Sequence, residues 1–214
     1  MNVSKDMLRL YAVTDSHWLG DRTLPQAVEE AILGGATFIQ LREKMLDTPA
    51  RIEAAKQVKA ITDHYHIPFV INDDVQAALA CGADGVHVGQ EDMQAADVRR
   101  LIGPDKILGV SAQTVEQALL AEANGADYLG VGAVFSTSTK ADAVEVPAPI
   151  LHDICQAVSI PVIAIGGIKA ENIMKLRNSG IVGIAVVSAI FAAPNIAQAT
   201  QSLAKAIQNM LEQI

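Results

Sequence analysis

Polar side chains alternate with apolar ones along the segment Ile39–Lys44. If this segment is a β-strand, successive side chains point to opposite faces, so Gln40, Arg42 and Lys44 share one face. Two cations on an inward face require an anionic partner, because an unpaired charge is costly to bury. Forked arginine donors suit phosphate, so the segment predicts a phosphate site. Local salt bridges to Glu43 or to later acids are the alternative.

Carboxylates follow two later segments that are rich in Val and Ile. The first ends in Asn72, Asp73 and Asp74, and the second leads into a loop that contains Glu91 and Asp92. Mg²⁺ is commonly held by one or two carboxylates plus substrate phosphate oxygens, and we assign this role to Asp73 and Asp92. The other acids are read as helix caps or as solvated loop residues.

His87 lies between these two groups of carboxylates in the sequence. It has no second ligand residue nearby, so we expect a packed, hydrogen-bonded histidine in the interior rather than a metal ligand or a general base.

Hydroxyl groups mark two further segments. Ser111 ends one Val-rich run, and the segment 135–140 carries four hydroxyl side chains followed by Lys140. Such a run is often only a solvated turn, but here it follows a strand with glycines at Gly130 and Gly132, which we expect to leave room for a ligand. The same expectation applies to Ala164 and Gly166 on the next strand.

A second anion site is expected where Gly166-Gly167 and Ser188 end the last two Val- and Ile-rich runs. Glycine lets backbone N–H groups approach a phosphate closely, and a following helix N-terminus favours negative charge. A Gly-Gly turn alone is weak support. With Arg42, Lys44 and Lys140 expected opposite, it indicates a pocket for two phosphorylated groups.

These residues need a scaffold that gathers strand ends. Short runs rich in Val, Ile and Gly alternate eight times with Ala- and Leu-rich stretches of helical period, which predicts parallel strands joined by helices. Eight units favour a single-domain (β/α)8 TIM barrel over residues 1–214, with the chemistry at the carboxyl ends of the strands. An open doubly wound sheet is the alternative. The expected strands are Leu8–Thr14, Thr37–Arg42, Pro68–Asn72, Gly85–Val88, Ile107–Ser111, Tyr128–Val134, Pro161–Ile165 and Gly183–Ser188.

An apolar stripe runs along the last expected helix, through Ile196, Leu203, Ile207, Met210 and Ile214. It either packs on the barrel or forms the surface of a homo-oligomer.

The composition of the chain argues against some classes of binding partner. The 214 residues carry a formal net charge of −8 and no run of Lys and Arg, which argues against nucleic acid. The apolar runs are too short and too interrupted to span a membrane, and the first residues lack the pattern of a secretory signal, so we expect a cytoplasmic protein. Cys81 and Cys155 have no CxxC spacing and are read as small buried hydrophobes.

Taken together, these strand ends resemble those of the thiamine phosphate synthase family from about Leu8 to Phe191. The most specific segments are 40–44, 71–74, 85–92, 109–111, 130–132, 137–140 and 165–168, which occur in this fixed order. The resemblance implies a barrel that condenses aminomethylpyrimidine diphosphate with thiazole phosphate and releases pyrophosphate, with Mg²⁺ as cofactor.

The resemblance also implies roles for individual residues. The pyrimidine diphosphate would be held by Gln40, Leu41, Arg42, Glu43, Lys44, Asn72, Ser111 and Lys140, of which Arg42, Lys44, Ser111 and Lys140 would act in catalysis. Mg²⁺ would be bound by Asp73 and Asp92. The thiazole phosphate would be held by Thr137, Ser138, Thr139, Gly167, Val187 and Ser188.

The implied chemistry needs charge stabilisation of the leaving pyrophosphate and no strong general base. This agrees with the absence of a nucleophilic Ser or Cys dyad in the sequence. Two alternatives stay open: a thiazole phosphate tautomerase of related fold, which needs one phosphate site and a proton shuttle, and a noncatalytic phospho-ligand-binding barrel.

Overall fold

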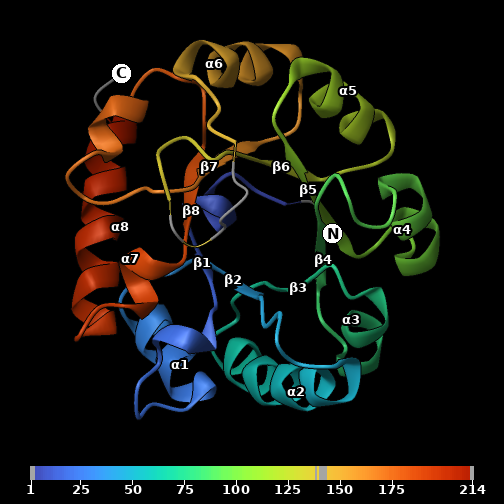
Figure 1. Cartoon of the computed structure of the whole chain (residues 1–214), viewed down its shortest axis with the longest axis vertical. Coiled ribbons are helices and arrows are strands. Elements are labelled where there is room, and N and C mark those ends of the chain that lie inside the picture. The colour runs from blue at the N-terminus through green and yellow to red at the C-terminus, as the bar shows by residue number, and fades with distance from the viewer. Residues whose placement is uncertain (1–2, 138, 140–143, 213–214) are drawn as a thin grey trace.

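The chain folds into a closed barrel of eight parallel strands surrounded by helices (Figure 1). The computed structural model describes residues 3–137, 139 and 144–212. The strands are β1 (Leu10–Val13), β2 (Phe38–Leu41), β3 (Phe69–Asn72), β4 (Gly85–Val88), β5 (Ile107–Ala112), β6 (Tyr128–Val131), β7 (Val162–Ile165) and β8 (Gly183–Val186). Pairing of β1 with β8 closes the sheet, so the barrel prediction is confirmed and the open sheet is excluded.

The helices follow the strands in alternation. They are α1 (Leu24–Leu33), α2 (Thr48–His64), α3 (Val75–Cys81), α4 (Ala95–Ile102), α5 (Val115–Ala123), α6 (Ala148–Ala157), α7 (Ser188–Phe191) and α8 (Ile196–Glu212), with 3₁₀ helices η1 (Asp6–Leu8), η2 (Ser16–Trp18) and η3 (Ile173–Leu176). Side-chain caps start several of them: Asp47 and Asp74 accept hydrogen bonds from the backbone N–H groups of Ala50 and Ala77. None of the helices described here is both long and apolar enough to cross a membrane.

Six strand predictions were too long by one to three residues at an end, and in two of them an extra residue belongs to another element. Leu8 belongs to η1 rather than to β1, and Ser188 begins α7 rather than ending β8. Strand β6 stops at Val131, three residues before the predicted end. The eight strands were otherwise located at the expected places.

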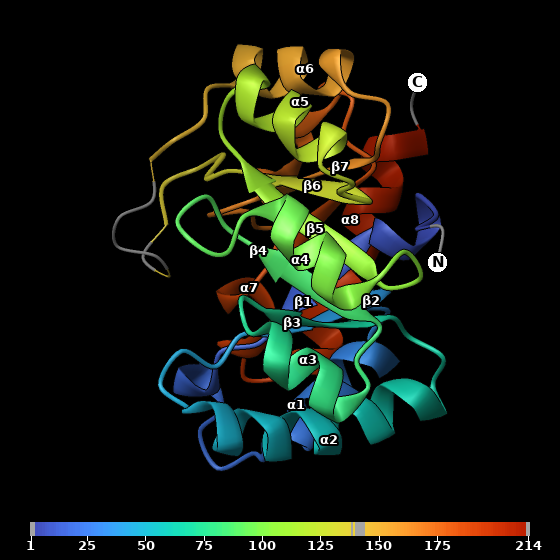
Figure 2. The ribbon, with the colours of Figure 1, turned by 90° about the vertical axis from the view of Figure 1, so that its right-hand side faces the viewer.

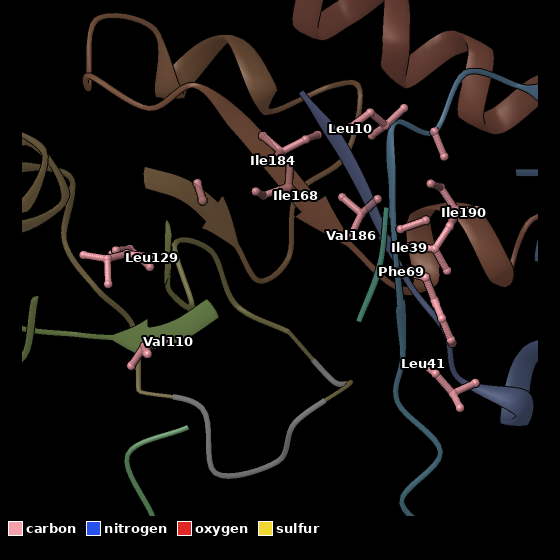
Figure 3. Close-up of a cluster of buried hydrophobic side chains, with 14 of the residues drawn as sticks. Leu10, Ile39, Leu41, Phe69, Val110, Leu129, Ile168, Ile184, Val186 and Ile190 are labelled. Carbon is pink, nitrogen blue, oxygen red and sulfur yellow. The ribbon is translucent and has the colours of Figure 1, made fainter. Parts of the chain in front are cut away.

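Apolar side chains fill both sides of the barrel wall. The larger cluster lies between the strands and the helices, and Figure 3 shows part of it, with Leu10, Ile184 and Val186 on neighbouring strands and Ile190 on α7. The apolar stripe of α8 joins this cluster: Ile196, Leu203, Ile207 and Met210 are buried against the barrel. The packing alternative for that stripe is therefore confirmed for these four residues, while Ile214 lies outside the described residues.

A smaller cluster plugs the barrel interior. It contains Leu8, Tyr11, Val13, Phe38, Val70, Ile107, Tyr128, Ile163 and Ala185. The loops that leave the carboxyl ends of the strands gather at one end of the barrel. In Figure 2 the loop between β6 and α6 (yellow) extends on the left, while η1 lies on the right, at the opposite end.

Candidate active site

Gln40 and Leu41 of β2 lie on opposite faces, as predicted, whereas Arg42 and Lys44 follow the strand, and Lys44 is exposed rather than buried as an inward-facing cation. The Gln40 amide donates a hydrogen bond of 2.6 Å to the hydroxyl of Tyr11 in the interior cluster. Leu41 is fully buried in the outer cluster, facing the helices. Any contact of Leu41 with a substrate would therefore come from its backbone.

Arg42 and Lys44 follow β2, and Lys44 lies near enough to Asp73 to act on the pKa of that carboxyl, in the lowering direction. Neither forms an ion pair with any residue that the structure describes. Glu43 is buried and accepts hydrogen bonds from the Thr14 hydroxyl at 2.7 Å and from the Ser16 backbone N–H at 3.1 Å. Its carboxylate thus holds the loop after β1 and does not neutralise the two cations, so the local salt-bridge alternative fails for Glu43.

Asp73 follows β3 directly and Asp92 lies in the loop after β4, and their carboxyl groups are close enough to interact. Burial, reinforced by the neighbouring Asp92 carboxyl, raises the pKa of Asp73 to about 6, although Lys44 and the Asn72 amide act in the opposite direction. Asp92 is held in place by the backbone N–H of Gly89, at 2.8 Å. Two facing carboxylates need a proton or a cation between them.

Asp73 and Asp92 provide only two carboxylates for a metal ion. Within the described residues no three His, Cys, Asp or Glu side chains gather as a metal cage. Mg²⁺ does not require such a cage, because it keeps several waters and accepts phosphate oxygens as ligands. The Asp73 and Asp92 pair beside Lys44 therefore fits a Mg²⁺ ion that is shared with a phosphorylated ligand.

His87 lies inside the barrel, as predicted. Its Nδ1 is 2.9 Å from the Tyr128 hydroxyl and its Nε2 is 3.0 Å from the Ser111 hydroxyl. Burial lowers the pKa of His87 to about 4, so the ring is neutral near pH 7. Gly130 makes room for this ring, since a Cβ there would lie 3.2 Å from His87 Cε1.

The other small residues expected to make space have different roles. Ala164 belongs to the outer cluster, and it is Ile163 and Ile165 that pack with the interior cluster, so the inward placement of Ala164 was wrong. A Cβ on Gly132 would lie 2.0 Å from the carbonyl oxygen of Ile165, and one on Gly166 would lie 2.5 Å from the Ala133 side chain. These two glycines permit close contact between β6 and β7 and their loops.

The loop after β6 is tied to the loop after β7. Val134 and Phe135 donate backbone hydrogen bonds to Ile165 and Gly166. Thr137 accepts a hydrogen bond from the Thr139 backbone N–H at 3.2 Å, whereas Ser138 and Lys140 lie outside the described residues.

Gly167 and Ser188 lie at the ends of the adjacent strands β7 and β8, as expected for a second anion site. Gly167 has φ +64°, and a Cβ there would lie 2.4 Å from the Ser136 carbonyl oxygen. Its lack of a side chain is therefore already required by the neighbouring loop. Val187 precedes α7, whose first residue is Ser188, so N–H groups of the first turn have no partner inside the helix.

Sequence reasoning missed Arg51, on the first turns of α2. Its guanidinium contacts Asp74 Oδ2 at 2.5 Å, the Leu46 carbonyl at 2.5 Å and the Glu43 carbonyl at 3.3 Å. It joins the loop that carries Lys44 to the loop that carries Asp73. The only sequence signal is an arginine near the start of a helix, a place that usually favours acidic residues.

Comparisons with known proteins place nearly the whole chain in one family. A family model described as thiamine monophosphate synthase matches residues 10–190. A thiamine-phosphate synthase of Ruminiclostridium cellulolyticum is 53% identical over 206 residues, which cover 96% of this chain and 98% of that protein. Thiamine-phosphate synthase 2 of Streptococcus pneumoniae is 44% identical over 98% of this chain and 100% of its own length. A solved thiamine phosphate pyrophosphorylase from Pyrococcus furiosus superposes with a TM-score of 0.89 at 40% identity, covering 97% of this chain and 98% of that one.

Proposed function

Because this chain belongs to the thiamine monophosphate synthase family and is an enzyme of that family, we propose that it joins 4-amino-2-methyl-5-hydroxymethylpyrimidine diphosphate to thiazole phosphate. The products are thiamine phosphate and pyrophosphate. One observation carries the proposal: Asp73 interacts with both Asp92 and Lys44, and the two acids lie in the loops after the adjacent strands β3 and β4. A carboxylate pair next to a cation suits a diphosphate that arrives with a divalent metal ion.

In this proposal the pyrimidine diphosphate binds over β2 to β5. Arg42 and Lys44, which form no ion pair among the described residues, contact the diphosphate oxygens together with Ser111, Asn72 and Lys140. Their charges stabilise the negative charge that accumulates on the departing pyrophosphate. Gln40 orients the pyrimidine from the floor of the site.

Asp73 and Asp92 would hold Mg²⁺, which when bound neutralises part of the diphosphate charge. The bond to pyrophosphate breaks dissociatively, since the electron-rich pyrimidine supports a cation-like methylene carbon. The thiazole nitrogen then attacks that carbon. No strong base is required, in keeping with a neutral, buried His87.

The thiazole phosphate binds across β6 to β8 in this proposal. Backbone N–H groups near Gly167 and at the start of α7 meet the phosphate, with hydroxyl groups from the loop after β6. The residues concerned are Thr137, Ser138, Thr139, Gly167, Val187 and Ser188. Binding both heterocycles in one pocket supplies proximity and keeps water from the reactive carbon.

The direct test mixes both heterocyclic substrates with Mg²⁺ and measures thiamine phosphate and pyrophosphate. Equal amounts of the two products support the proposal. Isomerised thiazole phosphate without pyrophosphate would indicate a tautomerase, and binding without any product would indicate a noncatalytic barrel. We expect the enzyme to act in the cytoplasm, with small molecules as its partners, and size measurement in solution would reveal a homo-oligomer.

A further inference from the structure

Five polar side chains form a continuous hydrogen-bonded chain through the barrel interior. Gln40 of β2 donates to Tyr11 of β1 at 2.6 Å, and the Tyr11 and Tyr128 hydroxyls are 2.9 Å apart. Tyr128 of β6 meets His87 Nδ1 at 2.9 Å, and His87 Nε2 meets Ser111 of β5 at 3.0 Å. The two ends of the chain, Gln40 and Ser111, are both residues to which we assign substrate contacts.

The middle of this chain is sealed from solvent. Tyr11, Tyr128 and His87 are 1%, 0% and 8% exposed. Each polar group there must find its partner within the chain, because an unsatisfied buried group is costly. The hydrogens are therefore ordered by their neighbours.

The order can be worked out from the Gln40 end. The amide N–H of Gln40 donates to the Tyr11 oxygen, so the Tyr11 hydrogen has to point to another acceptor, and the Tyr128 oxygen is the one in reach. Tyr128 in turn donates to Nδ1 of His87. A neutral imidazole has a single N–H, which must then be on Nε2.

The direction of the last link follows. Nε2–H of His87 donates to the Ser111 oxygen, so the Ser111 hydrogen is free to point away from His87 and to donate to a ligand. With the opposite order Ser111 would donate to His87 and could offer a diphosphate only lone pairs, which would repel it. The direction of the whole chain thus decides whether Ser111 can bind an anion.

We propose that His87, Tyr128 and Tyr11 are positioning residues that hold Ser111 as a hydrogen-bond donor to the diphosphate and couple it to Gln40 across the barrel. The role of Ser111 in this statement rests on the proposed function, whereas the hydrogen order does not. In this proposal the two tyrosines and His87 act through Ser111 and Gln40 and do not contact the substrate.

The first test concerns the hydrogen order alone. The protein is labelled with ¹⁵N at histidine, and the tautomer of His87 is read from its ring nitrogen shifts and couplings, with His87→Gln used to assign the signals. We expect the Nε2–H form. A ring protonated on Nδ1 would overturn the proposal whether or not the protein is a synthase.

The second test is a double-mutant cycle with Tyr128→Phe and Ser111→Ala, assayed for pyrophosphate release. Tyr128→Phe removes one hydroxyl and keeps the ring that fills the interior. We expect it to lower kcat about 10-fold, with the KM for thiazole phosphate changed less than about twofold. In the Ser111→Ala background the same change should have almost no further effect, because Tyr128 acts through Ser111.

A matched control is Tyr65→Phe, which removes a hydroxyl that contacts Glu29 away from the pocket. It should leave kcat unchanged in both backgrounds. If the fold-losses in kcat from Tyr128→Phe and Ser111→Ala multiply in the double variant, the positioning role is wrong. If the unmutated enzyme releases no pyrophosphate, the proposed function fails instead, and the tautomer measurement still judges the hydrogen order.

Discussion

Asp73 has a left-handed backbone conformation and a carboxyl group whose pKa is raised. Its φ is +63°, a region that Asn and Asp enter more readily than other side chains, and its carboxyl faces that of Asp92. An alanine there would confuse backbone strain with loss of charge, so asparagine is the informative substitution. The residue is thus held where its charge is unfavourable until a cation arrives.

We therefore predict that Asp73→Asn lowers kcat by at least about 100-fold and weakens Mg²⁺ binding, while its free energy of unfolding without metal stays equal or rises. Calorimetric titration of Mg²⁺, steady-state kinetics and urea unfolding measure the three quantities. Glu91→Gln is the matched control, since it neutralises an exposed acid of the neighbouring loop. Full activity in Asp73→Asn would show that Asp73 is not a ligand of the Mg²⁺ ion.

At the scale of elements, Arg51 links the loops after β2 and β3. Its planar fork reaches the Asp74 carboxylate and two backbone carbonyls together, and Asp74 also caps α3 and accepts from the Thr48 hydroxyl. A lysine cannot reproduce this geometry. The positions of Lys44 and Asp73 therefore depend on one side chain of α2.

The prediction is that Arg51→Lys lowers kcat/KM for the diphosphate about 10-fold and the free energy of unfolding by roughly 1 to 2 kcal/mol. Arg100→Lys, an exposed arginine on α4, should change neither value. Kinetics with each substrate and urea unfolding provide the comparison. Equal behaviour of the two variants would show that Arg51 does not organise the site.

The sequence patterns predicted where the strands and helices lie, but they identified only some of the side chains that point into the barrel. Alternation placed Gln40 correctly because β2 has polar residues on one face only. Strand β7 is apolar at every position and buried on both faces, so its sequence contains no signal for which residues point inward, and Ala164 was misplaced. Arg51 and the chain from Gln40 to Ser111 were missed because their partners come together only when the barrel closes.

For the whole molecule, the interior histidine makes stability depend on pH. The pKa of His87 is about 4 in the fold against about 6.5 in an unfolded chain. Between these values the unfolded chain binds a proton that the folded protein does not. The free energy of unfolding should therefore fall as the pH drops from 6.5 toward 4, by up to about 3 kcal/mol from this residue.

We predict that the difference in unfolding free energy between the unmutated protein and His87→Gln narrows by roughly 2 to 3 kcal/mol from about pH 7.5 to about pH 4.5. Urea unfolding at both pH values gives the difference directly. Other titrating groups, including Asp73 with its opposite dependence, are present in both proteins and largely cancel. Parallel stability curves would show that His87 has the same pKa in the folded protein as in the unfolded chain.

The filled barrel interior also determines where substrates enter the enzyme and where products leave it. Tyr11, Phe38, Ile107 and Tyr128 are fully or almost fully buried across the barrel, so nothing can pass from one end to the other. Both reactants must enter, and both products must leave, through the same mouth. The reactant that binds deeper cannot leave once the second reactant is bound above it. We therefore expect a compulsory order of addition and release, visible as product inhibition that is competitive toward only one of the two substrates.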